Sequence, residues 1–254
     1  MNSVMQHSSN RHGARRQRGF TLIEMMVAVG IGLVVALGLA VSFVNLKSTW
    51  GTQDKLAQLQ DNERLAMAFL TSSVQEAGYY PDPTNASPLP ASADGTYGNL
   101  AAGQGLMGTA ANLPTTSATL STAYATATGD GVLTCQGGTN STGATVFIRN
   151  VFYVNTTTHT LNCIVYANSS TATAPGAADA PLISNVSSMD VRYAVDTDGD
   201  GSVDAYLAAS DMTAARWLAV KAVRITLNFI NPNSAIDGNA TIPWVQTVNL
   251  MNNQ

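Results

Sequence analysis

Charged side chains are scarce in this 254-residue chain: 12 Lys and Arg with 16 Asp and Glu make up only 11% of the residues. Aromatic residues account for 7%, and there are three histidines and two cysteines. The sequence contains no HExxH, P-loop or GxSxG motif, so it lacks the usual signatures of zinc peptidases, phosphate-binding NTPases and serine hydrolases. Ser, Thr, Asn, Ala and Gly fill long stretches instead, which is typical of extracytoplasmic β-rich proteins rather than of cytosolic enzymes.

The few charges are unevenly distributed. Residues 1–19 contain four arginines and no acid, which leaves 8 of the 12 basic residues against all 16 acids in the rest of the chain. The four are Arg11, Arg15, Arg16 and Arg18. A basic tail is typical of nucleic-acid binding or of membrane topology. Because a long apolar run begins at Phe20, we favour topology, and we predict no specific nucleic-acid site in the acidic remainder.

The apolar run is long enough to cross a membrane. Residues 25–43 are a stretch of about 19 uncharged residues, which as a helix would span roughly 29 Å, close to the bilayer core of about 30 Å. With arginines before the run and none directly after it, the positive-inside rule places the N-terminus in the cytoplasm and the body outside. A cleaved secretory signal peptide is the alternative, but the apolar region of such a peptide is only about 7–15 residues long.

One acid, Glu24, lies near the start of this run. A carboxylate in a membrane span costs about 2.5–3.5 kcal/mol on insertion scales, so an acid at this position predicts a function.

Helical periodicity continues past the apolar run. Over residues 46–77, apolar side chains recur mostly at three- and four-residue steps, with charged residues between them. Gly51 is a weak point, and Gly78 with Pro81 predicts the end of the helix. We therefore expect one helix of about 55 residues over residues 20–77, hydrophobic all round in its first half and amphipathic in its second. The amphipathic half needs a surface to pack against.

The start of the run resembles the class III signal of type IV prepilins: a basic leader is followed by GFTLIE, residues 19–24, and then by the apolar stretch. The resemblance implies that a membrane prepilin peptidase cuts between Gly19 and Phe20 and that the new amine on Phe20 is methylated. It also implies that Glu24 pairs with an N-terminal amine and so aligns the subunit as it leaves the bilayer. A buried carboxylate is tolerable when a cation compensates it. The alternative for Glu24 is an interfacial acid that snorkels to the headgroups.

A second stretch, residues 59–81, resembles the helix end of PilW-type minor pilins, with Glu63 as a departure from that pattern. The acidic segment DTDGDGSVDAY and the last strand-like stretches are also similar in type to that family. This resemblance implies a non-enzymatic subunit that helps to initiate pilus assembly and supports adhesion, twitching motility or DNA uptake. The implied partners are other minor and major pilins, the inner-membrane assembly platform and, before assembly, membrane lipid. The implied location is the inner membrane, crossed once, with the body in the periplasm, and afterwards the pilus at the cell surface.

Two alternatives to this function stay open. A J-type minor pseudopilin of type II secretion would have the same N-terminal features. A membrane-anchored periplasmic module that binds its target through calcium and is never processed would share only the membrane span.

The residue patterns in the body of the chain predict β-strands. We expect an α+β fold in which the long N-terminal helix packs on an antiparallel β-sheet domain, with a leader at 1–19, the helix at 20–78 and a β-rich body at 79–254. Residues 145–154 and 160–167 predict a β-hairpin whose turn contains His159, and further strands are expected at 189–195, 203–208, 219–230 and 242–250. Residues 84–145 read as long loops with at most short edge strands.

The two cysteines, Cys135 and Cys163, predict a disulfide because the body lies outside the cytoplasm. The bridge would close a loop of about 29 residues and contribute roughly 3.5 kcal/mol in the chain-entropy model. A pair of reduced, buried thiols is the alternative, and a metal site from two cysteines without a histidine cluster is disfavoured.

An acidic segment carries carboxylates at positions 1, 3, 5 and 9 and a glycine at position 6 of an EF-hand-like loop. Hard oxygen ligands in this pattern predict a Ca²⁺ site, and carboxylates packed so closely would repel one another without a cation. The expected ligands are Asp196, Asp198, Asp200, Ser202 and Asp204. Position 12 departs from the pattern because Leu207 replaces the bidentate acid. An Asp/Gly-rich hairpin turn that needs no ion is the alternative.

Overall fold

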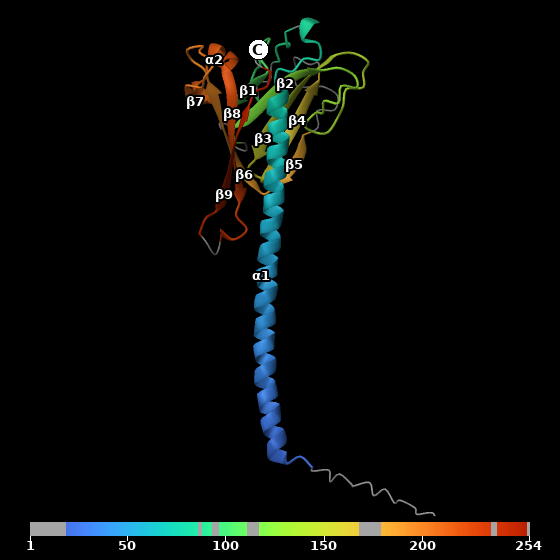
Figure 1. Cartoon of the computed structure of the whole chain (residues 1–254), viewed down its shortest axis with the longest axis vertical. Coiled ribbons are helices and arrows are strands. Elements are labelled where there is room, and N and C mark those ends of the chain that lie inside the picture. The colour runs from blue at the N-terminus through green and yellow to red at the C-terminus, as the bar shows by residue number, and fades with distance from the viewer. Residues whose placement is uncertain are drawn as a thin grey trace, which may run out of the picture. The chain divides into compact units, whose positions relative to one another are not determined.

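The computed structural model describes residues 19–85, 88–92, 97–110, 117–167, 179–234 and 238–252 (Figure 1). The chain divides into two compact units, one that ends at Gly51 and a second that comprises Thr52–Gln254. The helices are α1 (Leu22–Glu76), the short 3-10 segments η1 (Pro83–Asn85) and η2 (Ala209–Asp211), and α2 (Ala214–Leu218). The strands are β1 (Leu106–Thr109), β2 (Thr119–Thr126), β3 (Val146–Asn155), β4 (Thr160–Ala167), β5 (Ala180–Ser184), β6 (Val186–Val195), β7 (Ala205–Ala208), β8 (Val220–Ile230) and β9 (Thr241–Asn249).

The long helix α1 has 55 residues and confirms the predicted continuous helix. It is the one helix in the described part of the chain that is long and apolar enough to cross a membrane. Its residues 22–51 are almost all exposed, whereas its second half buries one face. The side chains of that face recur at helical spacing: Leu59, Glu63, Ala66, Met67, Leu70, Ser73 and Val74.

The second half of α1 packs on β-sheets, as its amphipathic pattern predicts. Leu70 and Val74 are fully buried and belong to the same core cluster as Phe152 from β3 and Ile225 from β8. This cluster draws side chains from the helix and from both sheets, so burial of its apolar surface joins all three layers.

The strands form two antiparallel sheets rather than one. The first has the order β1-β2-β3-β4-β5 and the second β7-β6-β8-β9. The predicted hairpin is β3–β4, in which Asn155 pairs with Thr160. His159 lies in its turn, exposed and at φ 54°, as expected for a solvated turn residue.

Strand β2 lies in the region that the sequence predicts to be loops, and it is an interior strand buried along its whole length. Apart from Leu120 and Tyr124, its residues are small or hydroxylated, so their composition resembles that of a loop. The hydroxyls are satisfied inside the fold: Thr122 Oγ1 lies 2.6 Å from Ser73 Oγ of α1, and Thr119 Oγ1 lies 2.8 Å from Thr109 Oγ1 of β1. Because buried polar groups cost little when they are hydrogen-bonded, this polar sequence can form a core strand.

The end of α1 is joined directly to the sheets. Gly78 adopts φ 78° and donates its N–H to the carbonyl of Ala123 in β2 at 2.8 Å. Positive φ favours glycine, which explains why the helix ends here. From the C-terminal segment, Asn252 Nδ2 donates to the carbonyls of Gln75 at 3.1 Å and Ala77 at 3.4 Å. The backbone is therefore hydrogen-bonded to β2 only two residues after the end of α1. The C-terminal segment accounts for two carbonyl groups at the end of the helix.

The predicted disulfide is present. Cys135, in the segment after β2, is bonded to Cys163 of β4, with their Cα atoms 6.4 Å apart. The bond ties the segment between β2 and β3 to the first sheet.

Candidate functional site

The predicted cleavage site lies just outside the long helix. Gly19 and Phe20 precede the first helical residue, Leu22, and both are exposed, with Phe20 at 84%. The peptide bond between Gly19 and Phe20 is therefore not part of the helical hydrogen-bond ladder. A peptidase could reach this bond without first unwinding α1.

Glu24 lies in the first turn of α1 and is exposed. Its N–H donates to Thr21 Oγ1 at 3.3 Å, and the N–H of Met25 donates to the carbonyl of Thr21 at 3.2 Å. Thr21 therefore occupies the N-cap position and Glu24 the third helical position, the spacing of a capping box. A carboxylate there is also favoured by the positive end of the helix dipole. This role of Thr21 was missed from the sequence, although the T-x-x-E spacing before an apolar run is its signal.

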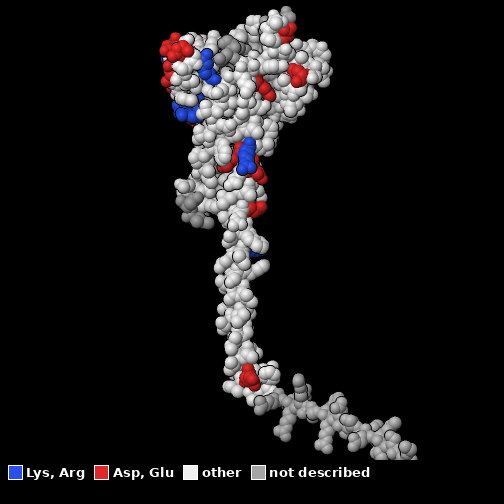
Figure 2. All heavy atoms as spheres, viewed as in Figure 1, with Lys and Arg blue, Asp and Glu red and all other residues white. Residues whose placement is uncertain are grey.

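The first half of α1 presents a mostly apolar surface. Glu24 is the only charged residue from Phe20 to Leu46, and the large apolar side chains in this range are at least half exposed. Figure 2 shows this stretch as nearly free of charge, with a single acidic side chain near its start. Exposed apolar surfaces of this kind are typical of segments that contact lipid or other proteins.

The acidic loop joins β6 to β7. Asp196 follows β6 directly and is buried, with 7% of its surface exposed. Its carboxylate accepts the N–H groups of Gly199 at 2.7 Å and Gly201 at 3.0 Å, and Lys221 Nζ lies 3.7 Å away. Both glycines have positive φ, 81° and 91°, which lets the loop fold back around Asp196. The contact with Lys221 was not predicted, because it joins the loop after β6 to strand β8, which follows later in the chain.

Two further acids of the loop, Asp200 and Asp204, accept hydrogen bonds from hydroxyl groups. Asp204 Oδ2 accepts both the hydroxyl and the N–H of Thr197 at 2.7 Å, and these bonds lower the pKa of Asp204. Asp200 Oδ1 accepts the hydroxyl and the N–H of Ser202, which lowers the pKa of Asp200. Hydrogen bonds to a carboxylate favour its charged form, so both acids stay ionised at neutral pH.

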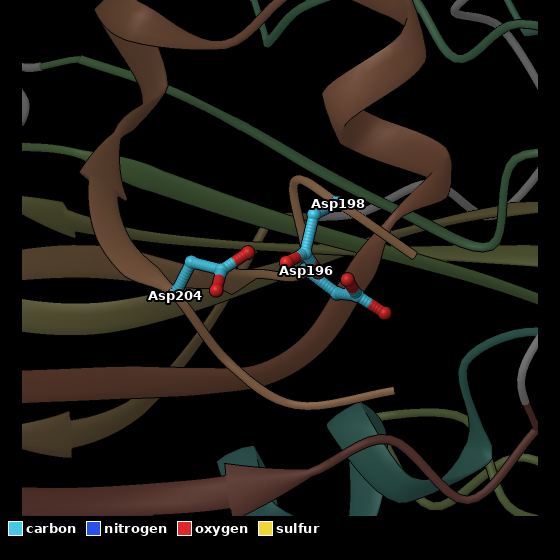
Figure 3. Close-up of side chains that lie close together, drawn as sticks. All are labelled: Asp196, Asp198 and Asp204. Carbon is cyan, nitrogen blue, oxygen red and sulfur yellow. The ribbon is translucent and has the colours of Figure 1, made fainter. Parts of the chain in front are cut away.

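Three of the five predicted metal ligands converge (Figure 3). Carboxylate oxygens of Asp196, Asp198 and Asp204 all lie within 4.8 Å of one another, so the group could hold a metal ion. Asp200 and Ser202 bond to each other instead. Position 12 of the EF-hand pattern, Leu207, lies in β7 and packs against the core, so the loop joins two strands rather than two helices.

Two family models match the chain. The prokaryotic N-terminal methylation motif matches residues 14–40, which include the predicted cleavage site and most of the apolar half of α1. The type IV pilus-assembly protein W model matches residues 151–244, from within β3 into β9. This second match includes the acidic segment and residues 220–230, on which part of the resemblance to PilW was based, and does not include residues 59–81, on which the rest was based.

Among solved structures, the chain is similar to a type IV-like pilin from Thermus thermophilus, with 13% identity and a TM-score of 0.41 over 76% of this chain and 96% of that one. No curated protein matches the sequence. The two family matches lie on the apolar helix and on the β-rich body. The chain is thus similar to the type IV pilus-assembly protein W family over part of its β-rich body, and it carries the prokaryotic N-terminal methylation motif at the start of α1.

Proposed function

We propose that this chain is a minor subunit of a type IV pilus that is cut between Gly19 and Phe20 and enters the filament through the apolar half of α1. The observation that carries the proposal is the exposed apolar helix with one acid in its first turn, directly after an accessible Gly-Phe bond. Before assembly, lipid of the inner membrane would cover this helix. In the filament, the helices of other pilins would take the place of the lipid.

In this proposal Glu24 sets the register of the subunit. In the uncut chain the nitrogen of Phe20 belongs to a peptide bond, so a cationic amine appears there only after cleavage. The carboxylate of Glu24 can then compensate an N-terminal amine in an apolar environment, where a charge without a partner is costly. The cap formed by Thr21 supports this role because it holds Glu24 in the first turn, close to the new N-terminus.

The β-rich body would give the subunit its choice of partners. We infer that it joins other minor pilins in a complex that primes assembly on the inner-membrane platform, and that it supports adhesion, twitching motility or DNA uptake. This role requires no catalysis, in agreement with the structural role typical of pilins.

The first experiment is N-terminal sequencing and intact-mass measurement of the protein from sheared pili and from membranes, with and without the prepilin peptidase. The proposal expects a chain that starts at a methylated Phe20 in the pilus fraction and an uncut chain in the strain without the peptidase. An uncut chain found only in membranes of both strains would overturn it and would favour the unprocessed membrane-anchored module.

The charge of Glu24 can be separated from its capping geometry. We expect Glu24→Gln to be cut normally but lost from the pilus fraction, because the amide cannot neutralise an amine, and Glu24→Asp to retain part of its incorporation. Equal incorporation of both variants would show that the carboxylate does not align the subunit.

The J-type pseudopilin alternative predicts a different phenotype. Deletion of the gene should abolish or reduce surface pili if the protein is a pilin, and should block secretion while leaving pili intact if it is a pseudopilin. Loss of secretion alone would replace the pilus role by the secretion role.

We also propose that the loop between β6 and β7 binds Ca²⁺ through Asp196, Asp198 and Asp204, supported by the convergence of their oxygens. We expect Ca²⁺ at millimolar concentration to raise the melting temperature of the full chain in detergent. Asp198→Asn should remove this increase, whereas Asp200→Asn, at an acid bonded to Ser202, should preserve it. No increase with the unaltered chain would leave the loop as a hairpin turn without an ion.

A further inference from the structure

Four strands lie at the edges of the two sheets, and three of them are short or irregular. Strands β1 and β7 have four residues each, and β5 has five residues and a register shift in its pairing with β4. Such features protect a sheet edge, whose free N–H and C=O groups would otherwise pair with another chain.

Strand β9 is different. It has nine residues and pairs with β8 in unbroken register from Thr241 to Asn249, and within the described residues no strand pairs with its other edge. Its sequence, TIPWVQTVN, contains no charged residue, and the only protective residue is Pro243 near its start. Residues 244–249 therefore form a regular, neutral edge.

Both faces of this edge carry exposed apolar side chains. Trp244 lies opposite Leu227 and so shares the inner face of the sheet, while Val245 lies opposite Thr226 on the outer face. Trp244 is 37% exposed and Val245 is 57% exposed. A strand added beside β9 would cover both side chains while satisfying the backbone groups of residues 244–249.

We propose that residues 244–249 of β9 accept an extended, uncharged β-strand from a pilin-like subunit of a different sequence, with apolar side chains next to Trp244 and Val245. The identity of the partner as a pilin-like subunit rests on the proposed function. The acceptor edge itself rests only on the length, regularity and neutrality of β9. This contact would add to the packing of the N-terminal helices and would give the body a means of selecting its neighbour.

The test is photo-crosslinking of the full chain in cells that make pili. A photoreactive phenylalanine replaces Thr247, which is exposed on β9, and in a control it replaces Tyr206, which is 42% exposed on the short edge strand β7. We expect position 247 to give a product with a pilin-like subunit, mapped by mass spectrometry to an extended segment of it, and position 206 to give none.

A second pair of variants tests whether the edge itself is required. Val245→Lys places a charge at the open edge and should cause loss of the product from position 247. Leu133→Lys changes a similarly exposed apolar side chain in the segment between β2 and β3 and should preserve that product. Retention of the disulfide and of protease resistance in both variants shows that the body is folded.

The outcomes separate this inference from the proposed function. No product from position 247 in a chain that is cut and recovered with pili would overturn the acceptor edge and leave the pilin role intact. A product in a chain that is never cut would support the edge and overturn the pilin role. A product that joins two copies of this chain, or one that maps to a helix of the partner, would overturn the proposed partner strand.

Discussion

Replacement of Leu70 by Ala tests whether the second half of α1 is an integral part of the body. Leu70 is fully buried in the core shared by α1 and the two sheets, so the change removes buried methyl groups and leaves a cavity. We expect a loss of about 3–5 kcal/mol in the free energy of unfolding. Leu65→Ala is a matched control on the same helix: Leu65 is 48% exposed, so its loss should be about 1 kcal/mol or less. The helix propensity change is the same in both variants and cancels.

Urea unfolding of the full chain in detergent, with the disulfide intact, measures the difference. Near-UV circular dichroism can follow the packed aromatic pair Tyr193 and Trp217, whose ring centroids are 4.6 Å apart. Leu70→Ala should lower the urea midpoint by roughly 1–2.5 M if the slope is about 2–3 kcal/mol per M. Equal, small decreases for Leu70→Ala and Leu65→Ala would refute the docking of this half of the helix on the sheets.

Three further predictions concern the body. Gly108→Ala should destabilise it by about 1–3 kcal/mol in the same assay, because a methyl group at Gly108 would collide with the Tyr193 hydroxyl. Gly51→Ala, with open space around its backbone in an exposed helix, should not destabilise it, and a loss there would contradict the steric argument. Burial raises the pKa of Glu63, so the unfolded chain releases this proton at lower pH than the folded chain does. Stability should therefore fall as pH rises from about 4.5 through the pKa of the folded state, and Glu63→Gln should flatten that dependence. An unchanged pH profile would show that Glu63 is not desolvated. Reduction of the disulfide should lower the free energy of unfolding by about 3.5 kcal/mol, and an unaltered urea midpoint would contradict this.

The elements with strong periodicity could be predicted from the sequence. The three- and four-residue spacing defined α1, and alternation defined β8, where Val223, Ile225 and Leu227 face the core. Strand β2 could not be predicted in this way because most of its buried positions are occupied by small or hydroxylated residues, and the partners of these residues, such as Ser73, are distant in the sequence. The division into two sheets could not be predicted either, because the alternation of apolar and polar residues within a strand does not show which strands pair.

For the candidate sites as well, contiguous motifs could be predicted from the sequence, whereas contacts between distant residues could not. Gly19 and Glu24 lie in one contiguous motif, so their places before and within the first turn of α1 followed from the sequence. Phe20 was expected to begin the helix but lies two residues before its first residue, Leu22. The acidic loop is also contiguous, and its glycines predicted a sharp turn. The burial of Asp196 and its contact with Lys221 depend on β8 lying beside β6, which only the folded chain shows.

The junction at the end of α1 has a mechanical consequence. The last turn of the helix is bonded to β2 through Gly78 and to the C-terminal segment through Asn252, which is 177 residues away from Gln75 along the chain. A force applied along the helix would therefore act directly on both β2 and the C-terminal segment, because no unbonded loop lies between the last turn and these contacts. A protein whose helix is joined to its body in this way would transmit tension as a stiff link. Its C-terminal residues would act as part of the attachment.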